Sequence, residues 1–145
     1  MEDDGSKALG TARLIATLTY VVPLVVFPAV PRMVKAEMSL DAQALALLTA
    51  VLGLVGIVDY GVSLFLEAKM LGRVQSGASD PRSGIISTAA VVSAFGASLA
   101  VYGLVLTFLG APVWGAAFYV LCAAHGLHLM TRWPNYQRAA ERSPY

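Results

Sequence analysis

The amino-acid sequence predicts an all-α integral membrane protein whose four transmembrane helices form a compact bundle with both termini in the cytoplasm. Apolar residues make up 57% of the 145 residues, and charged residues make up only 13%, about half the share usual in soluble domains. Between Arg82 and Arg132 lie 49 residues without Asp, Glu, Lys or Arg, whereas about 20 are enough to cross a bilayer. Such a chain indicates a single four-span membrane domain over residues 1–145 and excludes a water-soluble enzyme.

The first span is expected over residues 14–30, inside a stretch of 18 uncharged residues that is barely long enough to cross the hydrocarbon core. A cleaved signal peptide is the alternative for this stretch. The start Glu2-Asp3-Asp4 is acidic where a signal peptide is basic, which favours a retained span. Pro23 and Pro28 each remove a backbone donor, but prolines are common in ordinary spanning helices, so we do not expect a transporter hinge here.

The second span is expected over residues 42–68. Ser39 is suited to cap its N-terminus, and Asp41 would add favourable negative charge to its first turn. Only Asp59 interrupts the apolar part of this helix. A cytoplasmic connector, residues 70–83, follows and is rich in Ser, Gly, Asp and Pro, a composition typical of turns.

The uncharged stretch after Arg82 must contain two spans, because a single helix of that length would overshoot the bilayer. Glycine ends helices and proline suits their first turn, so the break belongs at Gly110-Ala111-Pro112. The third span is therefore expected over residues 84–109 and the fourth over 112–131. A cytoplasmic tail, residues 132–145, should leave the membrane at Trp133-Pro134.

The distribution of basic residues predicts the orientation. Eight of the ten Lys and Arg residues lie on the side that holds the N-terminal segment, the connector and the tail. Only Arg32 and Lys35 lie on the other side. Cytoplasmic loops carry the excess of positive charge, so both termini are expected in the cytoplasm, with the chain in the cell membrane.

Small residues on the third span predict how the helices pack. Association in lipid depends on close approach of backbones at small side chains, and we therefore expect this span at the centre. Homo-oligomerisation is the alternative use of the same residues, but packing within one bundle is favoured. Two stripes carry the prediction, Ala89, Ser93 and Ala97 in one and Gly96, Ala100 and Gly103 in the other.

An intramembrane polar pair, Asp59 and His125, is the main functional candidate. Asp59 lies ten residues before Lys69, and His125 lies seven residues before Arg132, which puts them ~15 and ~10 Å from the same end of two parallel helices. A carboxylate inside a span costs ~2.5–3.5 kcal/mol on insertion scales and so normally has a partner. We therefore expect Asp59 to contact His125, directly or through one water.

Two polar stripes continue from this pair toward the cytoplasmic end, and they are expected to face each other. They consist of Ser63 and Glu67 on the second span, and of His128 and Arg132 on the fourth. Such stripes could pair Glu67 with His128 or Arg132. They form either a proton or ion half-channel or a hydrogen-bonded lock between helices. No complete path across the membrane is visible, since no acid or base follows in the outer half.

No cofactor or metal is expected. The two histidines are three residues apart on one helix, so they cannot bind a haem from opposite sides. Asp59, Glu67, His125 and His128 are ligand types that suit zinc, iron or manganese, but a site would need one particular rotation of two helices. The sequence contains no phosphate-binding loop, nucleophile elbow or HExxH motif, and Cys122 is expected to be an apolar filler.

The run Ala97–Val105 resembles the carboxylate helix of the proton-translocating c (proteolipid) subunits of rotary ATPases. The resemblance lies in a small-Leu-Ala-aliphatic-Tyr-Gly pattern over nine residues. Ala97 stands where that family has its essential carboxylate, and the preceding span lacks the family's close glycine repeat. The resemblance therefore does not imply proton translocation by that mechanism.

These observations predict a non-catalytic accessory subunit or scaffold of a membrane complex. Its expected partners are the lipid bilayer and either another protein or further copies of the chain, and no nucleic acid. The alternative is a conductor or transporter of protons or cations that uses the Asp59–His125 site. A membrane enzyme built around the same residues is the least favoured class.

Overall fold

In the computed structural model, which describes residues 4–33 and 40–141, the described residues are helical apart from short turns. The helices are α1 (Asp4–Val26), α2 (Val30–Met33), α3 (Ala42–Gln75), α4 (Pro81–Phe108), α5 (Pro112–Thr131) and α6 (Trp133–Glu141). Four stretches of the described residues are long and apolar enough to cross a membrane: Gly5–Val26, Ala42–Gln75, Pro81–Phe108 and Pro112–Glu141. The predicted all-α architecture with four helices of spanning length is confirmed. Membrane insertion and the orientation of the termini stay predictions.

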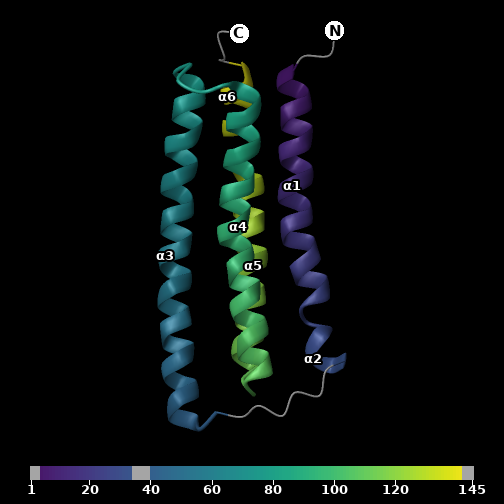
Figure 1. Cartoon of the computed structure of the whole chain (residues 1–145), viewed down its shortest axis with the longest axis vertical. Helices are drawn as coiled ribbons and strands as arrows, with labels where there is room; N and C mark the ends of the chain where they lie inside the picture. Colours follow the sequence, from purple (N-terminus) through teal and green to yellow (C-terminus); the bar gives the residue numbers. More distant parts are fainter. Residues whose placement is uncertain (1–3, 34–39, 142–145) are drawn as a thin grey trace.

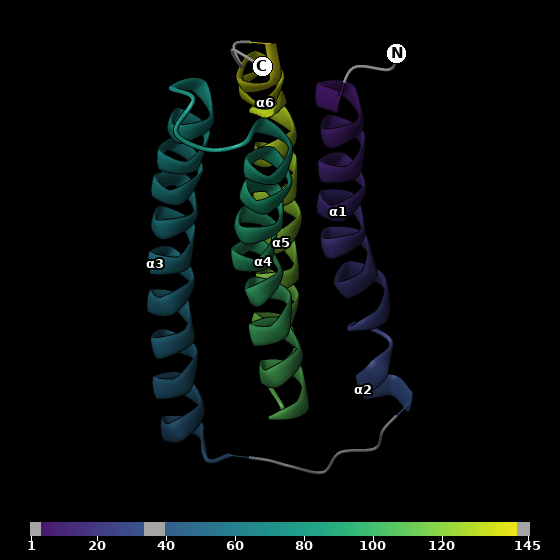
Figure 2. The ribbon, with the colours of Figure 1, turned by 45° about the horizontal axis from the view of Figure 1, so that its top comes forward.

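Helix α4 is the centre of the molecule. It packs against α1, α3 and α5, which lie around it with their axes along the long axis of the molecule (Figures 1 and 2). The start of α1, the α3–α4 turn and α6 all lie at one end, and α2 lies at the other. This arrangement confirms the prediction that the third span is central.

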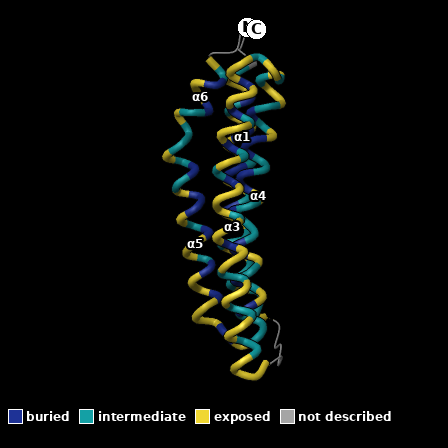
Figure 3. The backbone as a smooth tube through the Cα atoms, turned by 90° about the vertical axis from the view of Figure 1, so that its left-hand side faces the viewer, coloured by how far each residue is buried: buried dark blue, intermediate teal, exposed yellow. Residues whose placement is uncertain are grey.

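The bundle is more open than predicted, because α3 stands apart from all helices except α4 and α6. Only 6% of the most apolar stretch of α3 is buried within the chain, against 44% for α4. Figure 3 shows the same contrast, with α3 mostly exposed or intermediate along its length. Since α3 makes little contact with α5, a groove separates these two parallel helices.

Helix α1 is longer at its start than predicted and shorter at its end. It begins at Asp4 and ends at Val26, and Pro28 lies in the turn that follows. Its early turns stay helical because small side chains every fourth residue fit against α4. This buried stripe consists of Ala8, Ala12, Ala16 and Tyr20.

Helix α3 begins at Ala42, as predicted, but its cap differs. The predicted cap, Ser39, lies outside the described residues, and Asp41 holds the cap position, where its carboxylate accepts a hydrogen bond from Ala44 N at 2.8 Å. The helix continues to Gln75, seven residues beyond the predicted end. It does so because Leu71 and Val74 are buried, which stabilises the last turns.

The connector is therefore shorter than the predicted 70–83 and covers only residues 76–80. Gly77 turns the chain with φ of 73°, a conformation that favours glycine. Asp80 caps α4 by accepting a hydrogen bond from Ser83 N at 2.8 Å, and Pro81 begins the helix. This backbone hydrogen bond lowers the pKa of Asp80 below its ordinary value.

The break between the third and fourth spans lies where it was predicted. Gly110 has φ of 89°, and Ala111 N donates to Leu106 O at 2.8 Å to close the end of α4. No helix was predicted in the tail that follows. After Arg132 the chain forms α6, which packs on α3 and α1 and buries Tyr136 and Ala139. Pro134 permits this because it stands in the first turn of the new helix.

The small residues predicted to pack helices do so within one chain. Ala89, Ser93, Gly96, Ala100 and Gly103 are buried, whereas Ala97 is half-buried. A Cβ atom added at Gly103 would lie 2.8 Å from Gly115 O, so α4 and α5 cross there with their backbones in contact. Packing between helices of one chain therefore accounts for the burial of these small residues.

Candidate functional site

His125 is a buried node that joins three helices. Its Nδ1 atom lies 2.6 Å from the hydroxyl of Tyr20 on α1, and its Nε2 atom lies 2.9 Å from Oγ of Ser63 on α3. Both ring nitrogens are therefore used. With His125 itself on α5, the three side chains tie together all the helices that surround α4.

The hydrogen bonds around His125 favour one tautomer. The Ser63 hydroxyl donates its single proton to Tyr60 O at 2.8 Å, so Ser63 Oγ accepts from Nε2–H of His125. The Nδ1 atom then accepts from the Tyr20 hydroxyl. The imidazole is neutral and fully satisfied in this arrangement, as expected of a structural lock.

Two glycines make room for this node. A Cβ atom on Gly96 of α4 would lie 2.6 Å from His125 Nδ1 and would collide with the hydroxyl of Tyr20. A Cβ atom on Gly126 would lie 3.1 Å from the Tyr20 ring. Tyr60 covers the node from α3, edge-on to His125 with ring centroids 5.2 Å apart.

Asp59 lies elsewhere, and the predicted contact between Asp59 and His125 was wrong. Its Oδ2 atom accepts hydrogen bonds from Ser98 Oγ at 2.8 Å and from Tyr102 OH at 2.7 Å, both on α4. The depth difference of ~5 Å is about one helical turn, and tilt does not close it. His125 therefore meets Ser63, one turn beyond Asp59, and Asp59 turns toward α4.

The lower parts of the two polar stripes face each other as predicted. Arg132 Nε lies 3.0 Å from Glu67 Oε2, with Glu67 almost wholly buried and Arg132 partly exposed. The carboxylate of Glu67 pairs with Arg132 and also interacts with the side chain of Tyr136 on α6. Nε2 of His128 is buried without a hydrogen-bond partner among the described residues.

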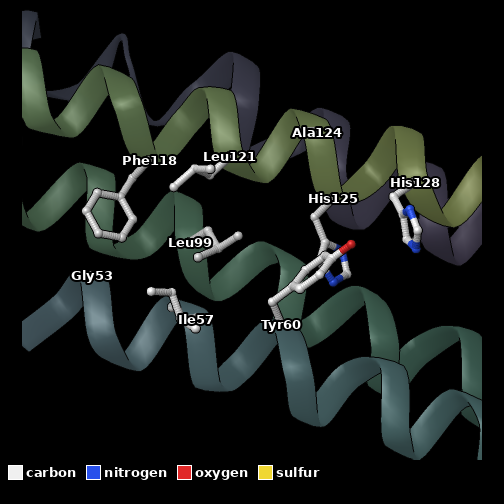
Figure 4. Close-up of a pocket in the computed structure, with 10 residues that line it drawn as sticks. Gly53, Ile57, Tyr60, Leu99, Phe118, Leu121, Ala124, His125 and His128 are labelled. Atoms are coloured by element: carbon white, nitrogen blue, oxygen red, sulfur yellow. The ribbon is translucent and has the colours of Figure 1, made fainter.

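A groove of about 440 Å³ opens between α3 and α5 beside this polar column (Figure 4). Residues of α3, α4 and α5 form its apolar part. Tyr60, His125 and His128 lie together at one end. The residues that line the apolar part are Gly53, Gly56, Ile57, Leu99, Phe118, Leu121 and Ala124.

A second, shallower hollow of about 240 Å³ lies between α3 and α4 at Asp59. Ala94, Phe95 and Ser98 of α4 complete its lining. Asp59 is only half-buried, and among the described residues it has hydroxyl partners but forms no ion pair. A carboxylate thus lies at the surface of two helices of spanning length.

Sequence reasoning missed the hydroxyl partners of both key residues. Tyr20 continues the four-residue spacing of Ala8, Ala12 and Ala16. This spacing puts all four residues on one helix face and was the signal that could have placed Tyr20 against α4. Ser98 and Tyr102 are also four residues apart and so share one face of their helix. Both donate to the same oxygen of Asp59 on α3.

No family model, curated protein or solved structure matches this chain. Within residues 4–33 and 40–141, no three His, Cys, Asp or Glu side chains gather closely enough to hold a metal ion. The functional argument therefore depends on the polar node at His125, the ion pair at Glu67, the surface carboxylate of Asp59 and the groove.

Proposed function

We propose that this chain is a multi-pass protein of the cell membrane, with both termini in the cytoplasm, that acts as a non-catalytic accessory subunit of a membrane complex. The side chain that supports this function best is Asp59. Two hydroxyls hold its Oδ2 atom, yet the residue is half-buried and borders an open hollow. A carboxylate that faces hydrocarbon is costly, and a further donor from outside the chain would remove that cost.

The chemistry of the hollow indicates the kind of partner. Ala94 and Ser98 are small and four residues apart on α4, so another helix could approach closely there. A lysine or arginine on that helix would complement the charge of Asp59. We therefore propose that the partner is a spanning helix of another protein with one basic residue at this depth.

The polar residues inside the chain support the non-catalytic part of the proposal. His125 has both nitrogens occupied by protein groups, and Glu67 is paired with Arg132. Side chains that are used in ties between helices are unavailable as acids, bases or nucleophiles. They stabilise the surface at Asp59 by fixing α3 relative to α5.

Charge reversal at Asp59 tests the proposal. The chain is isolated from its native membranes with mild detergent, and the mass of the complex is measured by native mass spectrometry for the wild type, Asp59→Asn and Asp59→Lys. We expect a heteromeric complex in the wild type, less of it in Asp59→Asn and none in Asp59→Lys. Val58→Lys is the matched control, since its position is exposed on the same helix. A complex that survives Asp59→Lys, or a homo-oligomer that responds to it, would contradict the proposal.

Proton conduction is the second candidate, and it now depends on Glu67 and not on an Asp59–His125 pair. Its support is the buried polar group of Glu67, Tyr136 and His128 near the end of α5, in which Nε2 of His128 has no hydrogen-bond partner among the described residues. Proton flux into liposomes that contain the purified chain tests it. Flux that is lost in Glu67→Gln would favour conduction over the accessory role, and the absence of flux in the wild type would exclude it.

A further inference from the structure

The groove between α3 and α5 has the form of a small-molecule site. Gly53 leaves open space on α3, whereas Gly56 lies against Leu99 of α4. Phe118 and Leu121 line the α5 side (Figure 4). Its volume of about 440 Å³ is within the range of ligand pockets, ~300–1,000 Å³. The open side faces outward between two helices of spanning length, so an occupant would enter sideways from the membrane.

The length of the groove matches one leaflet of a bilayer. From Phe118 to His128 the groove follows ten residues of α5, or ~15 Å at 1.5 Å per residue. Half of the ~30 Å hydrocarbon core is the same distance. An extended lipid chain could therefore lie along the groove, parallel to the helices, from the middle of the membrane toward the cytoplasmic side.

The polar end of the groove can bind a head group through Tyr60. Its side chain lies across that end beside His125 and His128 (Figure 4), and its hydroxyl forms no hydrogen bond within the described residues. His125 has no free nitrogen. The Tyr60 hydroxyl and Nε2 of His128, which is buried without a hydrogen-bond partner among the described residues, are thus the polar groups that can bind an oxygen atom of a ligand.

The charges nearby indicate a neutral head group. Arg132, one turn beyond His128, is paired with Glu67 at 3.0 Å and is therefore not free to attract an acid. Both ring nitrogens of His125 are already occupied by protein hydroxyls. An anionic head would lose its hydration at this end and gain no counter-ion.

We infer that the groove binds one single-chain lipid whose head is an uncharged, hydrogen-bonding oxygen group, such as a long-chain alcohol. Its chain lies between Gly53 and Phe118, and its oxygen bonds to Tyr60. This inference depends on the membrane location proposed above, but not on the partner at Asp59.

Labelling with a long-chain alcohol that carries a photoreactive diazirine in its chain tests the site, with the full chain in detergent micelles and in liposomes. Gly53 lines the groove, and a Cβ atom there meets nothing within 4 Å. The side chain added by Gly53→Leu therefore has room to fill the groove. Gly61→Leu is the matched control, since its Cβ also meets nothing within 4 Å and Gly61 does not line the groove. We expect the label on peptides of α3 and α5, at similar yield in the wild type and Gly61→Leu, and about tenfold lower yield in Gly53→Leu.

The head group is tested separately. Loss of one hydrogen bond in Tyr60→Phe should weaken labelling about three- to tenfold, and a carboxylate probe of equal chain length should label less than the alcohol. Equal labelling of Gly53→Leu, label spread over all exposed helix faces, or preference for the carboxylate would overturn the inference. Failure of the chain to float with liposomes would contradict the membrane location alone, because labelling in micelles reports on the groove independently.

Discussion

The hydroxyl of Tyr20 lies 2.6 Å from Nδ1 of His125, although 105 positions separate the two residues in the chain. This contact joins α1 to α5 across the face of α4 at Gly96, where a side chain would exclude it. Through the opposite nitrogen of His125 the tie extends to Ser63 of α3. The relative positions of three helices thus depend on one imidazole.

Removal of the Tyr20 hydroxyl should loosen this tie without breaking the fold. Tyr20→Phe keeps the ring and strands Nδ1 of His125, which should cost about 0.5–1.5 kcal/mol in unfolding free energy. The measurement is reversible unfolding in mixed micelles. Thr19→Val, at the neighbouring half-buried position where the hydroxyl bonds only to Ile15 O, is the control and should cost less. Equal effects of the two substitutions would argue against a special role of His125.

A methyl group at Gly96 should be far more harmful than one at an open glycine. Gly96→Ala places an atom against Tyr20 and His125 and should cost about 1–3 kcal/mol through overpacking. Gly61→Ala adds the same atom in open space and should stabilise α3 by up to ~1 kcal/mol through helix propensity. Unfolding midpoints of the two variants should therefore move in opposite directions. A neutral Gly96→Ala would mean that the node is not tightly packed.

Removal of one partner from the Glu67–Arg132 pair should be costly in an asymmetric way. Arg132→Met leaves a buried carboxylate without its cation, at a cost below the ~3–5 kcal/mol of a fully buried pair because Arg132 is partly exposed. Glu67→Gln leaves a cation that can turn outward, and it should cost less. The double variant should recover part of the loss of Arg132→Met. Strict additivity in this double-mutant cycle would show that the pair contributes nothing.

The stabilising effect of the Asp80 cap on α4 should decrease at acidic pH. Because folding lowers the pKa of Asp80, its stabilising effect is present above the unfolded pKa, near 3.8, and disappears as the pH falls through the lower folded pKa. Asp80→Asn can still cap the helix but does not titrate. The difference in unfolding free energy between wild type and Asp80→Asn should therefore change only at acidic pH. A difference in unfolding free energy that stays constant through the acidic range would contradict the cap interaction with Ser83.

Much of the architecture was predictable because it depends on local chemistry. Uncharged length sets the number of helices of spanning length, and glycine with proline sets the break at Gly110-Ala111-Pro112. It was also predictable that the two polar stripes face each other, because the residues of each stripe lie on a single face of their helix. The continuation of α3 to Gln75 and the formation of α6 were not, because buried contacts of Leu71 and Tyr136 outweigh weak local signals.

The partners of the polar residues required the tertiary structure. Sequence spacing gives depth along a helix to within a turn, and the ~5 Å offset between Asp59 and His125 was one turn. Each residue also rotates the side-chain direction by about 100°, so a small axial shift changes the neighbouring helix that a side chain meets. Only the packing of α3 on α4 decides that Asp59 meets Ser98 and Tyr102, and that His125 is left to Ser63 and Tyr20.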